Sequence, residues 1–575
     1  MKNTEAEASP PATSPEPTGS PMSIETMTHR QRIEALVGLL LGMFVAFLSS
    51  TIVSNALPVI IPALHGTQDQ YTWVVVATLL ASTATTPIWG KFSDLVSKKL
   101  LVQLALAVFT LGSVLAGFSH TVPMLIGARV IQGLGLGGLQ ALVLIVIAAM
   151  FSPRERGRYQ GPIAAVMAVA TIAGPLIGGV IVDTSWLGWR WTFFACVPLA
   201  VVAMLVIQRT LNLPIVRRKV QIDYLGATLI AAGVSVLLIW VTLAGKSFEW
   251  TSALSFALVI GSILVLALAV FVESKAAEPI IPLHLFRDRT TTLATIASIS
   301  VGVALFGSAV FLGQYFQISR GYSPTIAGLL SLPMILGSMI SSGVSGALIT
   351  KFGRWKGFLV GGAVFMSIGF FLLATIDHTT SIVLIGAYLL VLGLGMGCVM
   401  QNLVLAVQNT VAAKDLGSAT STVSFFRSLG GAAGVSVLGA VLSNHVASLI
   451  AKGLAALGID TGGMGAAGLN NLNELPGPIQ EIVRASYGDA TARIFLVSAV
   501  ISVLAFVAII FIREVKLRDE SGLEQLASTA AEESGVAEAI AGQVLTSEAL
   551  NADTLEADAP ESAGGLSDPL APQRA

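Results

Sequence analysis

Long apolar runs, separated by short polar segments, fill most of the chain. Many runs reach the roughly 20 residues that an α-helix needs to cross about 30 Å of hydrocarbon. They are continuously apolar and do not alternate between apolar and polar positions, which indicates helical spans rather than barrel strands. This pattern predicts about 14 spans, near residues 33–63, 71–89, 100–118, 123–150, 161–183, 191–208, 223–244, 252–272, 291–316, 323–350, 356–375, 381–410, 416–444 and 489–512.

The composition supports an all-α polytopic membrane protein. Hydrophobic residues make up 54% and charged residues 11% of the chain, whereas soluble domains carry about 25% charged residues. The net charge of −1, without a basic block, gives no indication of a nucleic-acid partner. Both cysteines, Cys196 and Cys398, lie in apolar runs, and the six histidines lie in loops or at helix ends, so we expect neither a disulfide nor a metal site.

Basic residues predict the orientation of the spans. With the N-terminus in the cytoplasm, the inner loops hold about 22 Lys and Arg and the outer loops about 6. An even number of spans then places both termini in the cytoplasm. We expect residues 1–32 and the acidic segment 516–575 to be mostly disordered tails, and residues 446–487 to form a long outer loop.

Two similar segments each follow an even-numbered span. "GKFSDLVSKK" follows the second span, and "GALITKFGRWK" follows the tenth. The recurrence predicts two related six-helix bundles, at residues 33–208 and 291–515, joined by two extra helices within residues 209–290. Repeats of this kind place a substrate cavity between the bundles, near the middle of the bilayer.

Three motifs occur in order on the expected helices: "GKFSDLVSKK", "ARVIQGLGLGG" and "AGPLIGG". With "TIVSNALP", "WRWTFFACVP", "EPIIPLHLF" and "GYSPTIAGLLSLP", they make residues 33–515 resemble the major facilitator superfamily, specifically its drug:proton antiporter branch with 14 helices. The resemblance implies the major facilitator fold and a secondary transporter that is driven by the proton gradient and needs no cofactor.

The motif "GKFSDLVSKK" suggests a gate. Gly90 permits close helix packing, and the carboxylate of Asp94 suits the N-terminus of a neighbouring helix. We expect Lys98 to reach the lipid headgroups. The resemblance implies that this segment closes the inner gate, and an ordinary charged loop is the alternative.

An arginine stands in the middle of the fourth span. Arg129 shares one helical face with Gln132. An arginine at the bilayer centre costs roughly 3 kcal/mol, so we expect this face to point to a cavity rather than to lipid. The resemblance implies that Arg129 takes part in proton coupling, and a purely structural role is the alternative.

The fifth span contains "AGPLIGG". Pro175 predicts a kink, and Gly174, Gly178 and Gly179 predict a flat packing surface. The resemblance identifies this stretch as the antiporter motif, which we expect to pack against the opposite bundle. A generic proline kink is the alternative.

The first span departs from the family pattern. Members commonly have an Asp shortly before "TIV", where this chain has Ser49 and Ser50. Every carboxylate in the predicted spans lies near a span end. A carboxylate that titrates near neutral pH is the simplest proton carrier, so Asp94 and Asp223 stay candidates for that role.

Scattered polar residues interrupt the apolar spans. As a group they describe an apolar cavity with few polar points, which suits lipophilic solutes, although each is equally suited to joining helices. The candidates are Ser49, Ser50, Asn55, Gln140, Gln314, Gln401, Asn402, Gln408 and Arg427.

These observations predict a transporter of the cell membrane and not an enzyme, because the sequence offers no nucleophile–base pair and no phosphate loop. We expect a monomer that exports lipophilic or amphipathic compounds in exchange for protons. Export of a lipid or a cell-wall precursor is one alternative. A receptor or scaffold that keeps the fold without transport is another.

Overall fold

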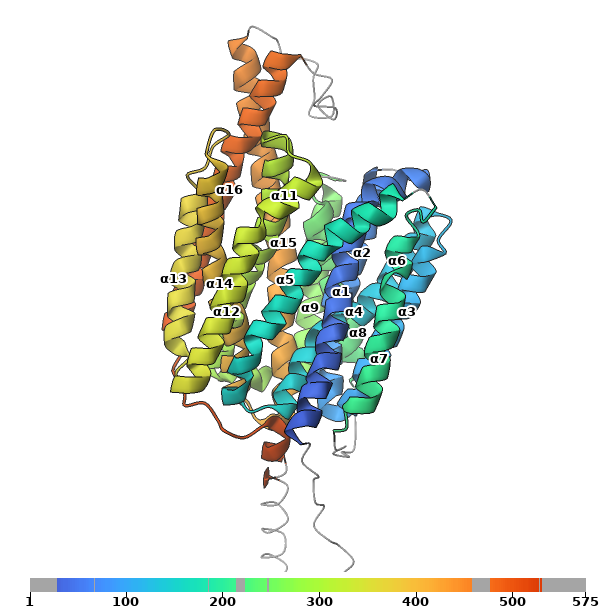
Figure 1. Cartoon of the computed structure of the whole chain (residues 1–575), viewed down its shortest axis with the longest axis vertical. Coiled ribbons are helices and arrows are strands. Elements are labelled where there is room, and N and C mark those ends of the chain that lie inside the picture. The colour runs from blue at the N-terminus through green and yellow to red at the C-terminus, as the bar shows by residue number, and fades with distance from the viewer. Residues whose placement is uncertain are drawn as a thin grey trace, which may run out of the picture. The chain divides into compact units, whose positions relative to one another are not determined.

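The structure is a computed structural model that describes residues 28–66, 68–184, 186–213, 223–245, 248–457, 476–526 and 528–529. Within its helices, the side chains of a few residues, including Asn55 and Pro175, lie outside the described set. In the described part of the chain, 14 helical segments are long and apolar enough to cross a membrane, as predicted. Figure 1 shows them packed side by side with similar tilts.

Seven helices build the first six-span bundle, since two short helices together make its sixth span. They are α1 (His29–Ala63), α2 (Gln68–Leu95), α3 (Lys98–Gly117), α4 (Val122–Met150), α5 (Pro153–Asp183), α6 (Trp191–Phe194) and α7 (Cys196–Thr210). The two linker helices are α8 (Tyr224–Leu243) and α9 (Ala253–Glu273).

The second bundle follows a short 3₁₀ turn, η1 (Leu283–Arg287). A π turn, η2, ends its first span, and a second 3₁₀ turn, η3, precedes α15. Its elements are α10 (Arg289–Gln314), η2 (Tyr315–Ser319), α11 (Pro324–Leu330), α12 (Leu332–Phe352), α13 (Lys356–Leu373), α14 (Ile382–Thr410), η3 (Ala413–Asp415), α15 (Leu416–Ala456) and α16 (Gly477–Ile510).

Each bundle has its own apolar core. Leu39, Phe109 and Leu142 are buried in a cluster formed by the first bundle, and Trp355 and Phe370 are buried in a cluster formed almost entirely by the second. The linker helices α8 and α9 pack on one another and share a further cluster with α2 and α15. The structure therefore has two six-helix bundles with two linker helices between them.

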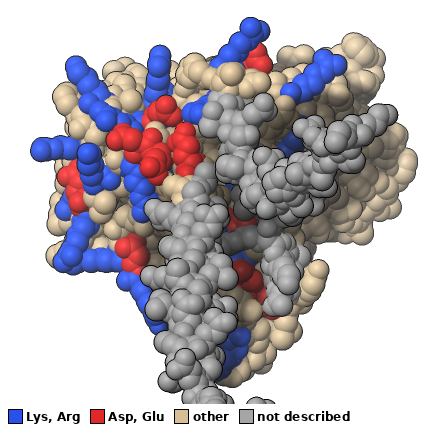
Figure 2. Space-filling model, turned by 90° about the horizontal axis from the view of Figure 1, so that it is seen from below, with Lys and Arg blue, Asp and Glu red and all other residues tan. Residues whose placement is uncertain are grey.

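The membrane-spanning helices begin and end at two faces of the molecule. We name these two faces by where the first and last helices lie. The terminal face is the one where α1 begins and α16 ends; the other is the opposite face (Figure 1). Figure 2 shows the terminal face with Lys and Arg side chains spread widely over it.

Two helices extend into segments that we predicted to be loops at the terminal face. Helix α2 continues to Leu95, so Gly90 and Asp94 lie on its last turns and not in a loop. Helix α5 begins at Pro153, where Ser152 caps it and Glu155 completes a capping box.

The prediction of an outer loop at residues 446–487 is wrong at both ends. Helix α15 continues to Ala456 and α16 starts at Gly477, so only residues 458–475 of that stretch lie outside the described residues. Val446 and Ile450 of α15 pack with Ile479 and Val483 of α16. Apolar residues at four-residue spacing extend the helix pair beyond the predicted spans, because each helix covers the apolar stripe of the other.

The start of the predicted C-terminal tail is ordered against the second bundle. Leu517 is buried, and the Arg518 amide donates to Asn409 Oδ1 at 2.9 Å. Just before the predicted tail, Glu514 Oε1 accepts the Trp355 amide at 3.1 Å. The described residues up to Gly522 belong to one compact unit, and those from Leu523 belong to a second. The rest of the predicted tail, from residue 530, lies outside the described residues.

Candidate functional site

A carboxylate of α2 caps the first turn of α15. Asp94 Oδ1 accepts the Gly417 amide at 2.8 Å, and Asp94 Oδ2 accepts both the amide and Oγ of Ser418 at 2.8 Å. The first amides of a helix have no partner inside it, and the helix dipole favours an anion there. Asp94 therefore joins the first bundle to the second at the terminal face.

Glycines let α2 and α15 come this close. A Cβ on Gly90 would lie 1.9 Å from Ser421 Oγ, and one on Gly417 would lie 2.4 Å from Gly90 O, whereas real Cβ atoms essentially never approach within 3.0 Å. Lys98, which we expected at the lipid headgroups, lies near enough to Asp94 for electrostatic attraction.

A second close contact joins α5 to α12. A Cβ on Gly346 would lie 1.9 Å from Gly157 O, so the two backbones touch. Beside it, Gln160 Nε2 donates to Asn402 Oδ1 at 2.9 Å. Ser342 Oγ donates to Gln160 O at 3.3 Å. In lipid, small residues and bonds between polar side chains are the main means of joining helices.

Arg156 of α5 reaches across to α14. It is buried, and it donates to Gln408 Oε1, to Phe151 O at 2.9 Å and to Ala148 O at 3.1 Å. Gln408 and Asn402 were cavity candidates from the sequence; the structure uses both to join the bundles. We call the whole set of contacts the terminal-face lock, and it comprises Gly90, Asp94, Arg156, Gly157, Gln160, Ser342, Gly346, Asn402, Gln408, Gly417 and Ser418.

Replacing Gln408 tests the lock. Gln408→Leu leaves the Arg156 guanidinium without one buried acceptor, and a hydrogen bond to a charged group contributes about 1.5–3 kcal/mol. We expect a cysteine introduced at buried Ser342 to react with a thiol reagent about tenfold faster in the Gln408→Leu background.

The matched control is Thr171→Val on the exposed side of α5, which should leave the rate unchanged. In a chain that already carries Arg156→Leu, the further change Gln408→Leu should add little, because the bond between the two side chains is already lost. Additive effects would contradict the pairing.

Arg129 lies at the centre of a polar network inside the first bundle. Its guanidinium donates to Gln132 Oε1 and to Val74 O at 3.5 Å. Gln132 Nε2 in turn donates to Ser113 Oγ at 2.8 Å and to Ser49 Oγ at 3.1 Å. Arg129 is 4% exposed, so its head group is enclosed by protein rather than turned to lipid. That it lines a passage open to water stays a prediction.

The antiporter motif packs on its own bundle. A Cβ on Gly174 would lie 2.0 Å from Thr51 Oγ1, and one on Gly178 would lie 3.2 Å from Ile52 O, so this part of α5 rests on α1. A Cβ on Gly179 would meet no atom within 4 Å. Our expectation that the motif faces the opposite bundle is therefore wrong. The close backbone contact with that bundle is made by Gly157, nearer the terminal face, and α5 has a smaller contact with α11.

The other candidates are spread over several helices. Asp223 caps α8, because its Oδ1 accepts the Gly226 amide at 2.7 Å. The side chain of Asn55 lies outside the described set. Roles in substrate binding stay predictions for the partly exposed residues Ser50 of α1, Gln140 of α4, Gln314 of α10, Gln401 of α14 and Arg427 of α15.

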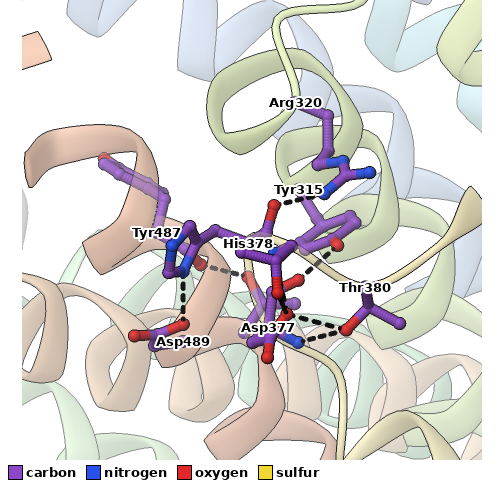
Figure 3. Close-up of polar contacts among 9 residues, drawn as sticks. Tyr315, Arg320, Asp377, His378, Thr380, Tyr487 and Asp489 are labelled. Atoms are coloured by element: carbon purple, nitrogen blue, oxygen red, sulfur yellow. Dashed lines mark hydrogen bonds and ion pairs between the residues drawn. The ribbon is translucent and has the colours of Figure 1, made fainter. Parts of the chain in front are cut away.

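A polar cluster lies near the opposite face of the second bundle (Figure 3). Tyr315 Oη donates to Asp377 O at 2.8 Å, and His378 Nδ1 lies 3.2 Å from Asp489 Oδ1. Hydrogen bonds from Thr379, and then from Thr380, lower the pKa of Asp377 to about 2. Asp377 therefore stays ionised at any physiological pH, and it is no candidate for the coupling proton.

The sequence analysis missed several of these residues. Arg156 stands between Arg154 and Arg158 at a helix start, where a solvated cluster is the ordinary interpretation. Gly157 and Gly346 gave a usable signal, because glycine near the same end of two spans favours close packing. Ser113 gave none, since a lone serine in an apolar span usually bonds to its own helix.

Comparisons with known proteins agree with this architecture. The Major Facilitator Superfamily profile matches residues 39–435. The chain is 35% identical to an uncharacterised MFS-type transporter of Mycobacterium tuberculosis, over 88% of this chain and 73% of that protein. It is 34% identical to multidrug transporter protein MdtP of Bacillus subtilis, over 73% and 77% of the two chains. It is 33% identical to efflux pump dotC of Dothistroma septosporum, over 84% of each.

Solved structures show the same fold at low identity. The proton:xylose symporter XylE aligns with a TM-score of 0.55 at 15% identity, over 87% of this chain and 99% of that one. The human organic anion transporter MFSD10 aligns with a TM-score of 0.55 at 13% identity, over 82% and 99%. The chain is a multi-pass membrane transporter rather than an enzyme, and it belongs to the Major Facilitator Superfamily.

Proposed function

We propose that the chain exports lipophilic or amphipathic compounds in exchange for protons, as a monomer whose two bundles give access to the two faces in turn. The relatives named as multidrug transporter and efflux pump support this substrate class. Sparse polar residues in apolar helices support it too, because a sugar would need denser hydrogen bonding.

The terminal-face lock is the observation that carries the proposal. It joins the bundles through three hydrogen bonds to Asp94 and through pairs of touching glycines, all of which can separate without breaking a helix. Alternating access needs such a set of contacts at one face, stable enough to form and weak enough to open. In this proposal, the contacts described here belong to the state in which that face is closed.

The terminal face is cytoplasmic in this proposal. Basic residues favour the cytoplasmic side of membrane proteins. Exposed Arg154, Arg158 and Lys351 all lie at the terminal ends of α5 and α12. The exporter would then release its cargo outside while the lock is formed.

Protons would drive the cycle through carboxylates at the terminal face. Protonation of Asp94 would remove the negative charge that the α15 amides bind, so the lock would weaken. A proton that enters down 100 mV of membrane potential releases about 2.3 kcal/mol, besides the contribution of the pH gradient. Arg129 and Gln132 would carry the signal within the first bundle.

Proteoliposomes test the whole proposal. Purified chain is reconstituted with an acidic lumen, and the transport of a fluorescent lipophilic cation is recorded, with a neutral antibiotic and a sugar as comparisons. We expect accumulation of the dye that collapses when an uncoupler is added, and no movement of the sugar. Dye movement that ignores the uncoupler would contradict proton exchange. Movement of lipid but not of dye would contradict the substrate class and favour a lipid exporter.

A further inference from the structure

The linker hairpin carries two acidic side chains at its terminal-face end. Asp223 caps the start of α8, and Glu273 is the last residue of α9. Each uses one oxygen on a backbone amide: Asp223 Oδ1 accepts from Gly226 at 2.7 Å, and Glu273 Oε2 accepts from Ile281 at 3.0 Å. These two bonds fix both carboxyl groups in place.

The two remaining oxygens border the same small space beside Gly226. A Cβ on Gly226 would lie 2.4 Å from Asp223 Oδ2 and 2.5 Å from Glu273 Oε1, so both oxygens border the same point. Both atoms are buried, and among the described residues neither has a hydrogen-bond partner. Glu273 as a whole is 4% exposed, which leaves little room for water to replace the missing donor.

A proton is the ligand that this arrangement lacks. Two ionised carboxylates whose buried oxygens border the same small space repel, and each leaves an acceptor unsatisfied. One proton on either oxygen creates an O–H···O⁻ hydrogen bond, which satisfies both atoms and halves the charge. We propose that Asp223 and Glu273 form a proton-binding site that holds one proton between them.

A buried lysine, Lys91, lies close to both the carboxylate pair and the terminal-face lock. Lys91 of α2, the neighbour of Gly90, is 5% exposed and forms an ion pair with Glu278 at 2.5 Å. Lys91 also attracts Glu273. Loss of the shared proton leaves two negative charges beside Lys91, which then compete with Glu278 for it. The coupling of this proton to the terminal-face lock rests on the proposed function, whereas the binding of the proton by Asp223 and Glu273 does not.

Among the described residues, few other charged groups lie near the pair, and some of these already have partners. Helix α15 also packs on α8, and near its start Asp415 is bonded to His284 at 3.1 Å, with Arg427 several turns further along. On the hairpin and the loop after it, Tyr224 and Lys275 are exposed. None of these offers a hydrogen bond to Asp223 Oδ2 or Glu273 Oε1 in the described structure.

Proton counting tests the site directly. The full chain in detergent is titrated between pH 5 and pH 9, together with Glu273→Gln and Asp223→Asn, which imitate the protonated pair. We expect the wild type to release one proton more than either amide variant. Glu249→Gln, an exposed acid at the other end of the same hairpin, serves as control. Glu249 lies far from the pair along the hairpin, so this control should release as many protons as the wild type.

Equal proton release from the wild type and both pair variants would overturn the site. If neither variant folds, infrared spectroscopy of the wild type decides, because a protonated carboxyl band must disappear as the pH rises through the range. The titration needs no substrate, so failure of dye transport would leave it standing. If the wild type transports dye but releases no extra proton, the proton-binding site is contradicted and the proposed function is not.

Discussion

Gly90→Val is expected to abolish transport while the protein still folds. The new Cβ would lie 1.9 Å from Ser421 Oγ and 2.8 Å from Gly417 O, so α2 and α15 must move apart. That movement withdraws Asp94 from the α15 amides. Each hydrogen bond to a charged group contributes about 1.5–3 kcal/mol, and a change of roughly 5.5 kcal/mol turns a 99:1 equilibrium into 1:99. We therefore expect the closed terminal face to become a rare state and transport to fall about 100-fold.

Dye accumulation in proteoliposomes measures the loss. Thiol labelling of a cysteine at Ser342 measures the opening, which should become faster in the variant. Gly361→Val is the matched control, because the same substitution on α13 meets no atom within 4 Å at the Cβ position. It should transport at the normal rate. Normal transport by Gly90→Val would show that close approach of α2 and α15 is not needed.

The sequence predicted the helices well, because the bilayer leaves the backbone few options. A chain in hydrocarbon must satisfy its amides internally, so each long apolar run becomes a helix. The ends were less predictable. Val446 and Ile479 lie in segments with polar neighbours that we assigned to a loop, and their helices continue because the pair α15–α16 buries a shared apolar stripe.

Rotation of the helices about their axes was harder to predict. A helix that is apolar on all sides offers no pattern to show which face meets which neighbour. Gly174 and Gly157 lie on the same helix, yet the first contacts α1 and the second contacts α12. Sequence could identify both as packing positions, but only the three-dimensional arrangement assigns the partner.

Contacts between residues far apart in the chain were the other feature that the sequence could not predict. The sequence indicated that Asp94 suits a helix N-terminus. The structure identifies that helix as α15, whose Gly417 amide donates to Asp94 although the two residues are 323 positions apart. Arg156 and Gln408, separated by 252 residues, gave no comparable indication. An arginine in a basic cluster and a glutamine in an apolar span have many possible partners, and neither charge nor spacing selects one.

Arg129→Ala is expected to remove transport without destabilising the protein. In the described part of the chain Arg129 takes part in no ion pair, and its partners, Gln132 Oε1 and Val74 O, are neutral. A buried cation without a counter-charge costs several kcal/mol of desolvation. Arg129→Ala removes this desolvation cost, and the gain offsets the loss of the hydrogen bonds to Gln132 and Val74. The melting temperature should therefore stay within a few degrees of the wild type. A residue kept only for packing would show the opposite pattern, with a lower melting temperature and normal transport.

The charge can be separated from the shape at this position. Arg129→Lys keeps the cation but loses the planar fork that binds Gln132, so partial transport is expected. Arg129→Met keeps much of the volume without charge, and its transport should fall about 100-fold, as in Arg129→Ala, which corresponds to a barrier higher by roughly 2.7 kcal/mol. Arg158→Ala, an exposed arginine at the terminal face, is the control and should transport normally. Uncoupler-sensitive dye transport at the wild-type rate in Arg129→Met would show that the buried charge plays no part in coupling, because nothing else in the network carries a positive charge to replace it.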